Sequence, residues 1–140
     1  MFLIKDGILI KYAKEERDGP NVAIPDNVMV IGDYAFADQK DIEVVRLGSQ
    51  TKIIGNHAFD GCGLSRIIMK DCVTIGKYAF ANCPNLRRIL IGKSVRRVCD
   101  NAFAGTKMEL IALEAKTDAF SRWSISNCGH PQITIINKKR

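Results

Sequence analysis

Cysteine and histidine are the side chains in this sequence best suited to metal or nucleophilic chemistry. The chain of 140 residues holds five cysteines and two histidines, His57 and His130. No two cysteines are spaced Cys-x-x-Cys and the histidines lie far apart in the chain, so neither a zinc site nor a His-Glu-x-x-His protease motif is indicated. Glycine-rich phosphate-binding loops and the Gly-x-Ser-x-Gly nucleophile motif are also absent. We therefore predict a protein that is not an enzyme and has no metal and no cofactor.

Apolar residues recur with a fixed period between residues 22 and 113. The clearest copy, in residues 74–91, ends in the pattern Leu-x-x-Ile-x-Ile. The same pattern returns in steps of 22 residues, beginning at Ile42, Leu64, Leu86 and Met108. A repeat of this length with such a core is typical of a leucine-rich-repeat solenoid. We predict an α/β-type solenoid, mainly β, of about four to five repeats.

A second apolar column precedes each of these strands. Its pattern is Ile-Gly-x-x-Ala-Phe, and its phenylalanines are Phe36, Phe59, Phe80 and Phe103. When successive coils stack, the Ile, Ala and Phe of each copy can face inward and build one continuous core. Cys99 stands where the other copies have glycine, so either this position needs no positive φ or the coil is strained there.

The N-terminal segment is predicted to cap the solenoid. Residues 2–12 read FLIKDGILIKY, two apolar runs around Asp6-Gly7, which is a strong β-hairpin signal. Such a hairpin would cover the open edge of the first coil. We divide one domain, 1–140, into an N-terminal cap and link (1–21), repeats (22–113) and a C-terminal cap (114–140).

The C-terminal segment is predicted to form a second cap. Thr117-Asp118 followed by AFSRWSIS indicates a capped short helix with Phe120 and Trp123 on one side. Trp123 would then cover the last core layer. Ile133-Thr134-Ile135 continues the step of 22 residues and is predicted to be the last strand.

The bulk composition bears on the compartment and on the class of partner. The net charge is +6, and half of that value comes from Lys138, Lys139 and Arg140, which we interpret as a solvated tail. The apolar run at residues 2–4 is too short for a signal peptide, and no stretch is long enough to span a membrane. An odd number of cysteines and the lack of an Asn-x-Ser/Thr site favour the cytoplasm, with a trimmed piece of a secreted or surface protein as the alternative.

The repeat unit resembles a known family. Ile54-Gly55, residues 58–62, Ile75-Gly76 and residues 79–83 carry the pattern Ile-Gly-x-x-Ala-Phe-x-x-Cys of BspA-type (treponemal) leucine-rich repeats. The opening residues 6–12 also look like the usual start of such proteins. The resemblance implies a right-handed curved solenoid that serves adhesion or recognition, with no catalytic residues. A fragment of a bacterial cell-surface adhesin is therefore an alternative function.

The outward face of the repeated strands is the predicted binding site. Side chains alternate between the two faces of a strand, which leaves two columns facing outward. Their centre holds arginine and aliphatic residues, namely Arg46, Arg66, Ile68, Arg88, Leu90 and Leu110. Arginine beside exposed apolar residues is typical of interaction hot spots. We predict that this face binds an acidic or amphipathic protein, the alternative being a solvated face whose arginine stems cover apolar surface.

Two other functions remain open. Electrostatic binding of nucleic acid or an acidic polysaccharide follows from the net charge of +6. It ranks lower because the strand face lacks the aromatic residues on which single-stranded nucleic acids stack. A structural role within a larger repeat assembly is the third hypothesis, although two caps would predict a monomer or small oligomer.

Cys62 and Cys83 occupy equivalent places in neighbouring copies, where Thr106 and Gln39 stand in others. Because the column does not demand sulfur, we predict buried free thiols that act as small apolar side chains. A disulfide between the two in an oxidising compartment stays open, since adjacent coils would bring them within range.

Overall fold

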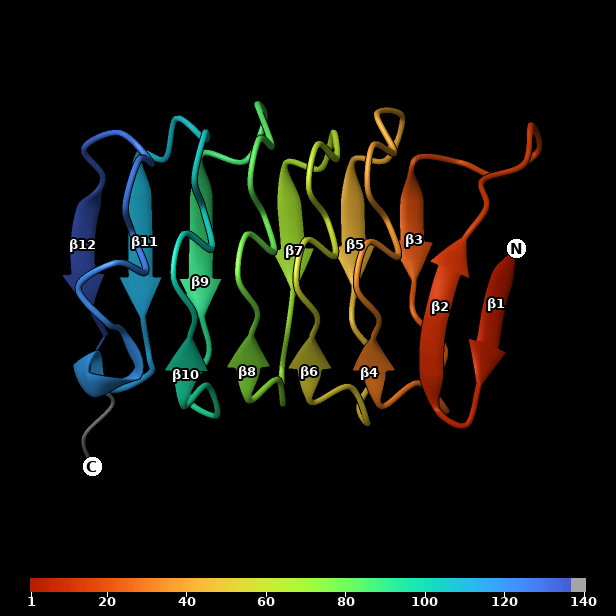
Figure 1. Cartoon of the computed structure of the whole chain (residues 1–140), viewed down its shortest axis with the longest axis horizontal. Helices are drawn as coiled ribbons and strands as arrows, with labels where there is room; N and C mark the ends of the chain where they lie inside the picture. The colour runs from red at the N-terminus through yellow and green to blue at the C-terminus, as the bar shows by residue number, and fades with distance from the viewer. Residues whose placement is uncertain (137–140) are drawn as a thin grey trace.

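Each coil of the chain contributes one long strand to one side of a solenoid and one short strand to the other (Figure 1). The computed structural model describes residues 1–136. The long strands are β3 (Asn21–Ala23), β5 (Val44–Arg46), β7 (Arg66–Ile68), β9 (Arg88–Ile91), β11 (Leu110–Leu113) and β12 (Gln132–Ile135). The short strands are β4 (Val30–Ile31), β6 (Ile53–Ile54), β8 (Thr74–Ile75) and β10 (Arg97–Val98). The chain is thus a mainly-β solenoid of about six turns.

The long strands pair in parallel with the register that the repeat predicts. Val45 pairs with Ile67, and Ile89 pairs with Ile111. All four side chains are buried, with at most 7% of their surface exposed. The predicted inward columns are therefore confirmed.

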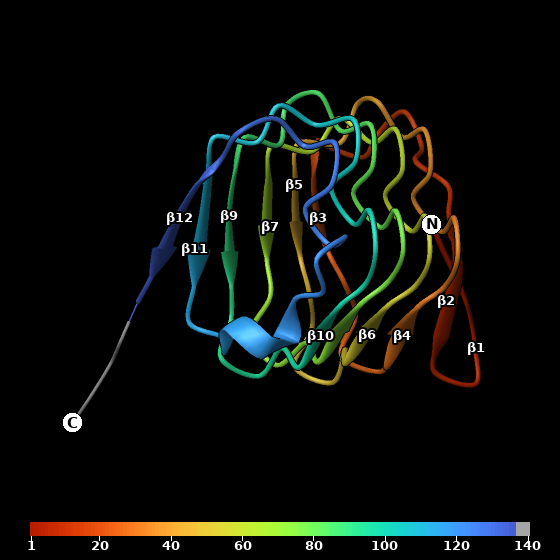
Figure 2. The same cartoon turned by 60° about the vertical axis from the view of Figure 1, so that its left-hand side comes forward.

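A hairpin begins the six-stranded sheet on the other side (Figure 2). Strands β1 (Phe2–Lys5) and β2 (Ile8–Tyr12) pair antiparallel, and β2 pairs in parallel with β4. The turn residues Asp6 and Gly7 have φ of 53° and 79°, values that this residue pair tolerates well. The predicted hairpin is confirmed, and it lies against the first coil.

The core is built around a stack of phenylalanine rings. Phe36, Phe59, Phe80 and Phe103 are fully buried, and successive ring centroids lie 4.9, 5.3 and 5.8 Å apart with planes within 13° of parallel. The backbone supports this stack, because the N–H groups of the first three donate to the alanine carbonyl of the next coil at 2.7–2.8 Å. Each coil is therefore tied to the next at its centre as well as along its strands.

The glycine column consists of Gly32, Gly55 and Gly76, with Cys99 at the same position in the next copy. None of these glycines, nor Cys99, has a positive φ. Instead, a Cβ on Gly76 would lie 2.7 Å from both the backbone carbon of Gly55 and the Oδ1 of Asn56. Glycine serves here because the previous coil passes close by, and the column needs no left-handed backbone.

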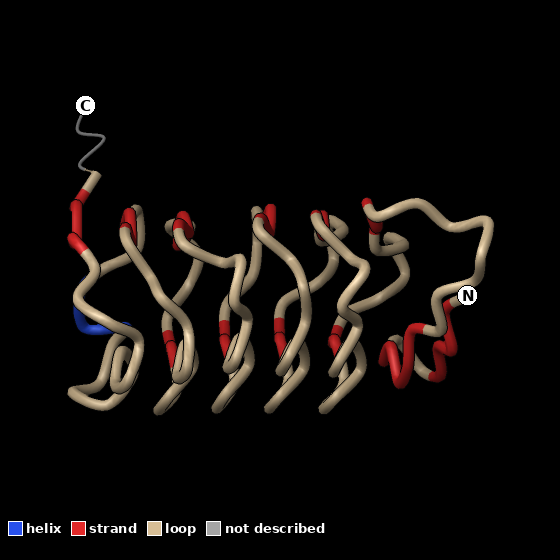
Figure 3. Tube along the Cα trace, turned by 90° about the horizontal axis from the view of Figure 1, so that it is seen from above, coloured by secondary structure: helices blue, strands red, loops and turns tan. Residues whose placement is uncertain are grey.

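The predicted helical cap is wrong. The helical structure in residues 1–136 is confined to a three-residue 3-10 helix, η1 (Thr117–Ala119). Phe120 bridges to Val98 in parallel, and the N–H of Asn101 donates to the carbonyl of Trp123 at 2.9 Å. Residues 120–128 therefore continue the solenoid as another coil (Figure 3).

The helix was predicted because Ala119-Phe120 comes too early in the chain for the phenylalanine column. Counted 22 residues on from Val98, Phe120 falls in the isoleucine column and Ile125 in the phenylalanine column. Trp123 then takes the outward place of Asn101 and is 53% exposed, so it does not cover the core.

The predicted last strand is present, and its inward side chains are open to solvent. β12 pairs with β11, Ile133 facing Ile111 and Ile135 facing Leu113. Ile133 and Ile135 are 47% and 61% exposed, whereas Ile111 is fully buried. The basic run at residues 138–140, interpreted above as a solvated tail, lies outside the described residues.

Candidate functional site

The predicted outward columns lie on the face of the long strands. Arg66 pairs with Val44 and Ile68 with Arg46, while on the other side Leu110 pairs with Arg88. The three arginines are exposed, and Leu90 is 46% exposed. The alternation of strand side chains thus places these residues outward as expected.

The ladder of long strands is interrupted between β7 and β9. These strands belong to two separate three-stranded sheets, β3-β5-β7 and β9-β11-β12. At the other steps, the N–H group of the first residue in each strand donates to a carbonyl of the previous coil. The Arg66 N–H donates to the Glu43 carbonyl at 3.3 Å, and the Leu110 N–H donates to the Arg87 carbonyl at 3.1 Å. No equivalent bond joins the Arg88 N–H to the previous coil within residues 1–136. The expected continuous ladder is therefore wrong at this step, and Figure 1 shows the wider separation of the two strands.

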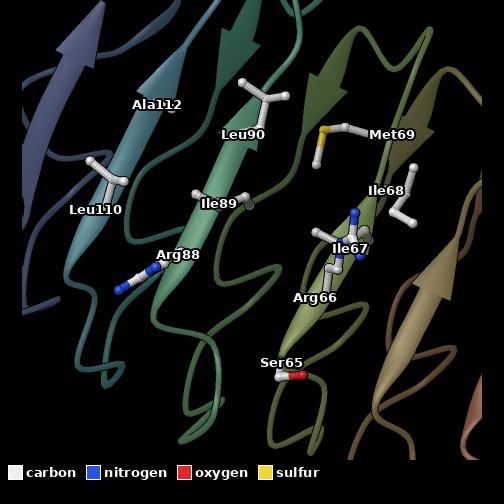
Figure 4. Close-up of a pocket in the computed structure, with 10 residues that line it drawn as sticks. All are labelled: Ser65, Arg66, Ile67, Ile68, Met69, Arg88, Ile89, Leu90, Leu110 and Ala112. Atoms are coloured by element: carbon white, nitrogen blue, oxygen red, sulfur yellow. The ribbon is translucent and has the colours of Figure 1, made fainter.

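A cavity of about 550 Å³ lies over this interruption (Figure 4). Most of its lining is apolar, with two arginines and one serine. The lining residues are Ser65, Arg66, Ile67, Ile68, Met69, Arg88, Ile89, Leu90, Leu110 and Ala112. Five of the six predicted site residues thus line one cavity.

The sixth predicted residue, Arg46, lines a second cavity of about 390 Å³. This cavity lies at the C-terminal ends of the same strands. Its lining residues are Arg46, Leu47, Ser49, Ile68, Met69, Lys70, Gly92, Lys93 and Glu114. Ile68 and Met69 line both cavities, which therefore adjoin along β7, and we call the two cavities together the groove.

Within residues 1–136, the arginine side chains of this groove, Arg46, Arg66 and Arg88, form no salt bridge with a protein carboxylate. Glu109, the nearby carboxylate, pairs with Arg87 at 3.0 Å. A guanidinium without a protein carboxylate beside an apolar wall suits a ligand that brings its own carboxylate.

Met69 is the lining residue that the repeat pattern misplaced. It was predicted to be an inward core residue, yet it is half-buried and lines both cavities. Its neighbours at the interruption, Ile67 and Ile89, are 7% and 5% exposed, whereas Val45 and Ile111 are fully buried. The Leu-x-x-Ile-x-Ile pattern carries no signal for this opening, because apolar residues fill it in every copy.

The buried thiols are unsuited to nucleophilic chemistry. Cys62 and Cys83 are fully buried and free, as predicted, and the Cys83 thiol donates to the Phe59 carbonyl at 3.0 Å. Burial raises the pKa of Cys62 to about 11 and that of Cys72 to about 12. Burial also raises the pKa of Cys83. These thiols stay protonated at neutral pH, which leaves them without the thiolate that nucleophilic attack requires.

His57 belongs to an aromatic stack on the opposite side of the coils. Its ring lies between Tyr34 and Tyr78, with centroids 4.8 and 5.0 Å away and planes within 5° of parallel. Its Nδ1 lies 2.8 Å from the Asp60 carboxylate, whose other oxygen accepts a bond from Asn82 at 3.0 Å. The two tyrosine rings cover both faces of the imidazole, and the stack therefore connects three successive coils. The edges of the rings face the solvent.

Within residues 1–136, no three side chains of histidine, cysteine, aspartate or glutamate come together in a way that could hold a metal ion. No helix in that range is both long enough and apolar enough to cross a membrane.

A protein-family model matches most of the chain. The model described as "BspA type Leucine rich repeat region" matches residues 12–131 in six copies. The repeat number of four to five predicted above is therefore too low. The matched range includes residues 120–128, which had been taken for a cap. No curated protein sequence matched the chain.

Several solved structures share the fold. A leucine rich cell surface protein from Faecalibacterium prausnitzii A2-165 is 27% identical, with a TM-score of 0.81 over 94% of this chain and 36% of that one. The pneumococcal vaccine antigen PcpA is 17% identical, with a TM-score of 0.66 over 96% of this chain and 40% of that one. A leucine rich repeat protein from T. pallidum is 20% identical, with a TM-score of 0.55 over 91% of this chain and 76% of that one. This chain thus spans little more than a third of the length of the first two.

Proposed function

The chain belongs to the BspA type leucine rich repeat family, and from this premise we propose that it is a recognition module that binds an acidic segment of a protein through its long-strand face. The observation that carries the proposal is the cavity over the interrupted ladder. It places exposed Arg66 and Arg88 beside the apolar side chains of Ile68 and Leu90. Arginine anchors beside a desolvated apolar pocket are the usual composition of a binding hot spot.

The family and its relatives support a binding or adhesion role without catalysis. The similar Faecalibacterium protein is a leucine rich cell surface protein, which favours the cell surface over the cytoplasm for this chain. This chain covers only 36% of that protein, and we therefore propose the cell-surface location as part of the function. In an adhesin, the groove would be one contact site among several along a longer solenoid.

The second candidate function is electrostatic binding of nucleic acid or an acidic polysaccharide, which the net charge of +6 favours. Such binding releases counterions, so affinity would fall by roughly tenfold for every two phosphate contacts between 50 and 200 mM salt. The cavity lining contains no aromatic side chain for base stacking. Recognition of a protein segment explains the apolar part of the groove, which a purely electrostatic ligand would leave unused.

Selection of peptides from a random displayed library tests the protein-binding proposal. The selected peptides are expected to be rich in aspartate and glutamate, and their affinity is expected to fall at least tenfold on Arg66→Glu/Arg88→Glu. The matched control is Arg96→Glu/Arg97→Glu, which changes the net charge equally on the side of β10. A control variant that weakens binding as much as the groove variant would contradict the proposal.

A further inference from the structure

The groove has a basic end, an apolar middle and a second basic end. Arg66 and Arg88 stand at the N-terminal starts of β7 and β9. Ile68, Met69 and Leu90 follow along the strands, and Figure 4 shows Leu90 and Met69 toward one end of the gap with Arg88 toward the other.

The far end of the groove is also basic. Exposed Lys70 and Lys93 line it together with Glu114, whereas Arg46 lies level with Ile68, its pairing partner on β7. Two cations and one carboxylate leave a net positive charge at this end. An apolar middle between two positive ends calls for a ligand with the complementary order of charges.

The spacing of these ends selects an extended ligand. Arg66 begins β7 and Lys70 follows two residues after its end at Ile68. Four residues of extended chain span about 13 Å at the usual rise of 3.3 Å per residue. In an extended peptide, residues i, i+2 and i+4 share a face and span the same distance. On a helix, by contrast, residues i and i+4 lie only about 6 Å apart. An extended segment therefore matches both basic ends with its middle side chain over the apolar part.

We propose that the groove recognises an extended segment of another protein with carboxylates at i and i+4 and a large aliphatic side chain at i+2. This inference rests on the proposed function and specifies its ligand. The carboxylate at i lies against Arg66 and Arg88, and the aliphatic side chain enters between β7 and β9 against Met69 and Leu90. The carboxylate at i+4 lies against Lys70 and its basic neighbour.

The chain cannot supply this segment to a second copy of itself. Its only two acidic residues spaced i and i+4 are Glu114 and Asp118, and the residue between them at i+2 is Lys116. A lysine there would bring a positive charge to the apolar middle of a basic groove. The partner that we propose is accordingly a different protein.

Two labelled peptides of one composition test the proposal by fluorescence anisotropy on the whole chain. The first contains Glu-Ser-Leu-Ser-Glu, and the second contains Leu-Ser-Ser-Glu-Glu with the same flanking residues. The first is expected to bind about tenfold more tightly, because the second cannot reach both basic ends while burying its leucine. Leucine-to-serine replacement in the first peptide is expected to cost about tenfold as well.

The Arg66→Glu/Arg88→Glu variant separates failure of this inference from failure of the proposed function. Equal binding of both peptides, lost in that variant and kept in Arg96→Glu/Arg97→Glu, would overturn the spacing while leaving an acid-binding face. Equal loss in both variants would overturn both proposals. Absence of binding by the first peptide would overturn the inference, as would a dimer in sedimentation that dissociates on Arg66→Glu/Arg88→Glu.

Discussion

Replacement of Phe80 by leucine measures how much the ring stack contributes to stability. Phe80 is fully buried between Phe59 and Phe103, with centroids 5.3 and 5.8 Å away and planes within 8° of parallel. Leucine keeps most of the buried volume but removes both ring pairs, each worth about 0.5–1.5 kcal/mol. Adding about 1 kcal/mol for imperfect repacking, the expected loss of unfolding free energy is about 2–4 kcal/mol. Urea unfolding followed by circular dichroism provides the assay.

The matched control is Phe103→Leu, made in the same column at the end of the stack. Among residues 1–136, Phe103 stacks only on Phe80, so its replacement removes one ring pair instead of two. The loss should be smaller than for Phe80→Leu by the value of one pair, about 0.5–1.5 kcal/mol. Equal losses in the two variants, at an unchanged m-value, would refute the reasoning that the rings stabilise the coils pairwise.

Three further predictions follow from burial. A maleimide is expected to label the half-exposed Cys99 within minutes while Cys62, Cys72 and Cys83 react only on unfolding, and early labelling of any of the three would contradict their placement in the core. Trp123→Ala should cost less than about 1 kcal/mol because Trp123 is 53% exposed, whereas the lid predicted from sequence would cost about 3–5 kcal/mol in a thermal or urea melt. The Cys62 thiol has a pKa of about 11 in the folded protein and of about 8.5 in the unfolded chain. Its contribution to the free energy of unfolding is therefore present below about pH 8.5 and is lost as pH rises toward 11. Cys62→Ser should therefore make the alkaline fall in unfolding free energy shallower by about 1.4 kcal/mol per pH unit.

The fold was predictable from the sequence because its period is regular. Steps of 22 residues locate the inward columns, the pairing of Ile89 with Ile111 and the last strand at Ile133. The Asp6-Gly7 turn identifies the hairpin, since both residues tolerate a positive φ.

The coil at residues 120–128 was missed because its side chains depart from the motif. Phe120 stands in the isoleucine column and Ile125 in the phenylalanine column, so Ala119-Phe120 came too early for the phenylalanine column and the repeat was taken to be interrupted. The hydrogen bond from Asn101 to the Trp123 carbonyl shows the correct alignment. Backbone pairing holds the coil in place although its column residues differ.

The candidate site was predictable in its residues but not in its shape. Alternation along the strands placed Arg66, Arg88 and Leu90 outward, and the structure confirms that placement. The cavity depends on the missing pairing of β7 with β9, which brings Met69 to the surface. The step of 22 residues between successive strands does not indicate this interruption.

Amide chemical-shift mapping with the Glu-Ser-Leu-Ser-Glu peptide tests the central claim most directly. In the ¹⁵N-labelled chain, the largest shifts are expected on residues 65–70 and 88–93, which form the two walls of the groove. The amides of β10, which includes Arg97, and of the adjacent Arg96, on the other sheet, are expected to stay unchanged. Shifts centred on that sheet, or spread evenly over the basic surface, would contradict recognition by the groove.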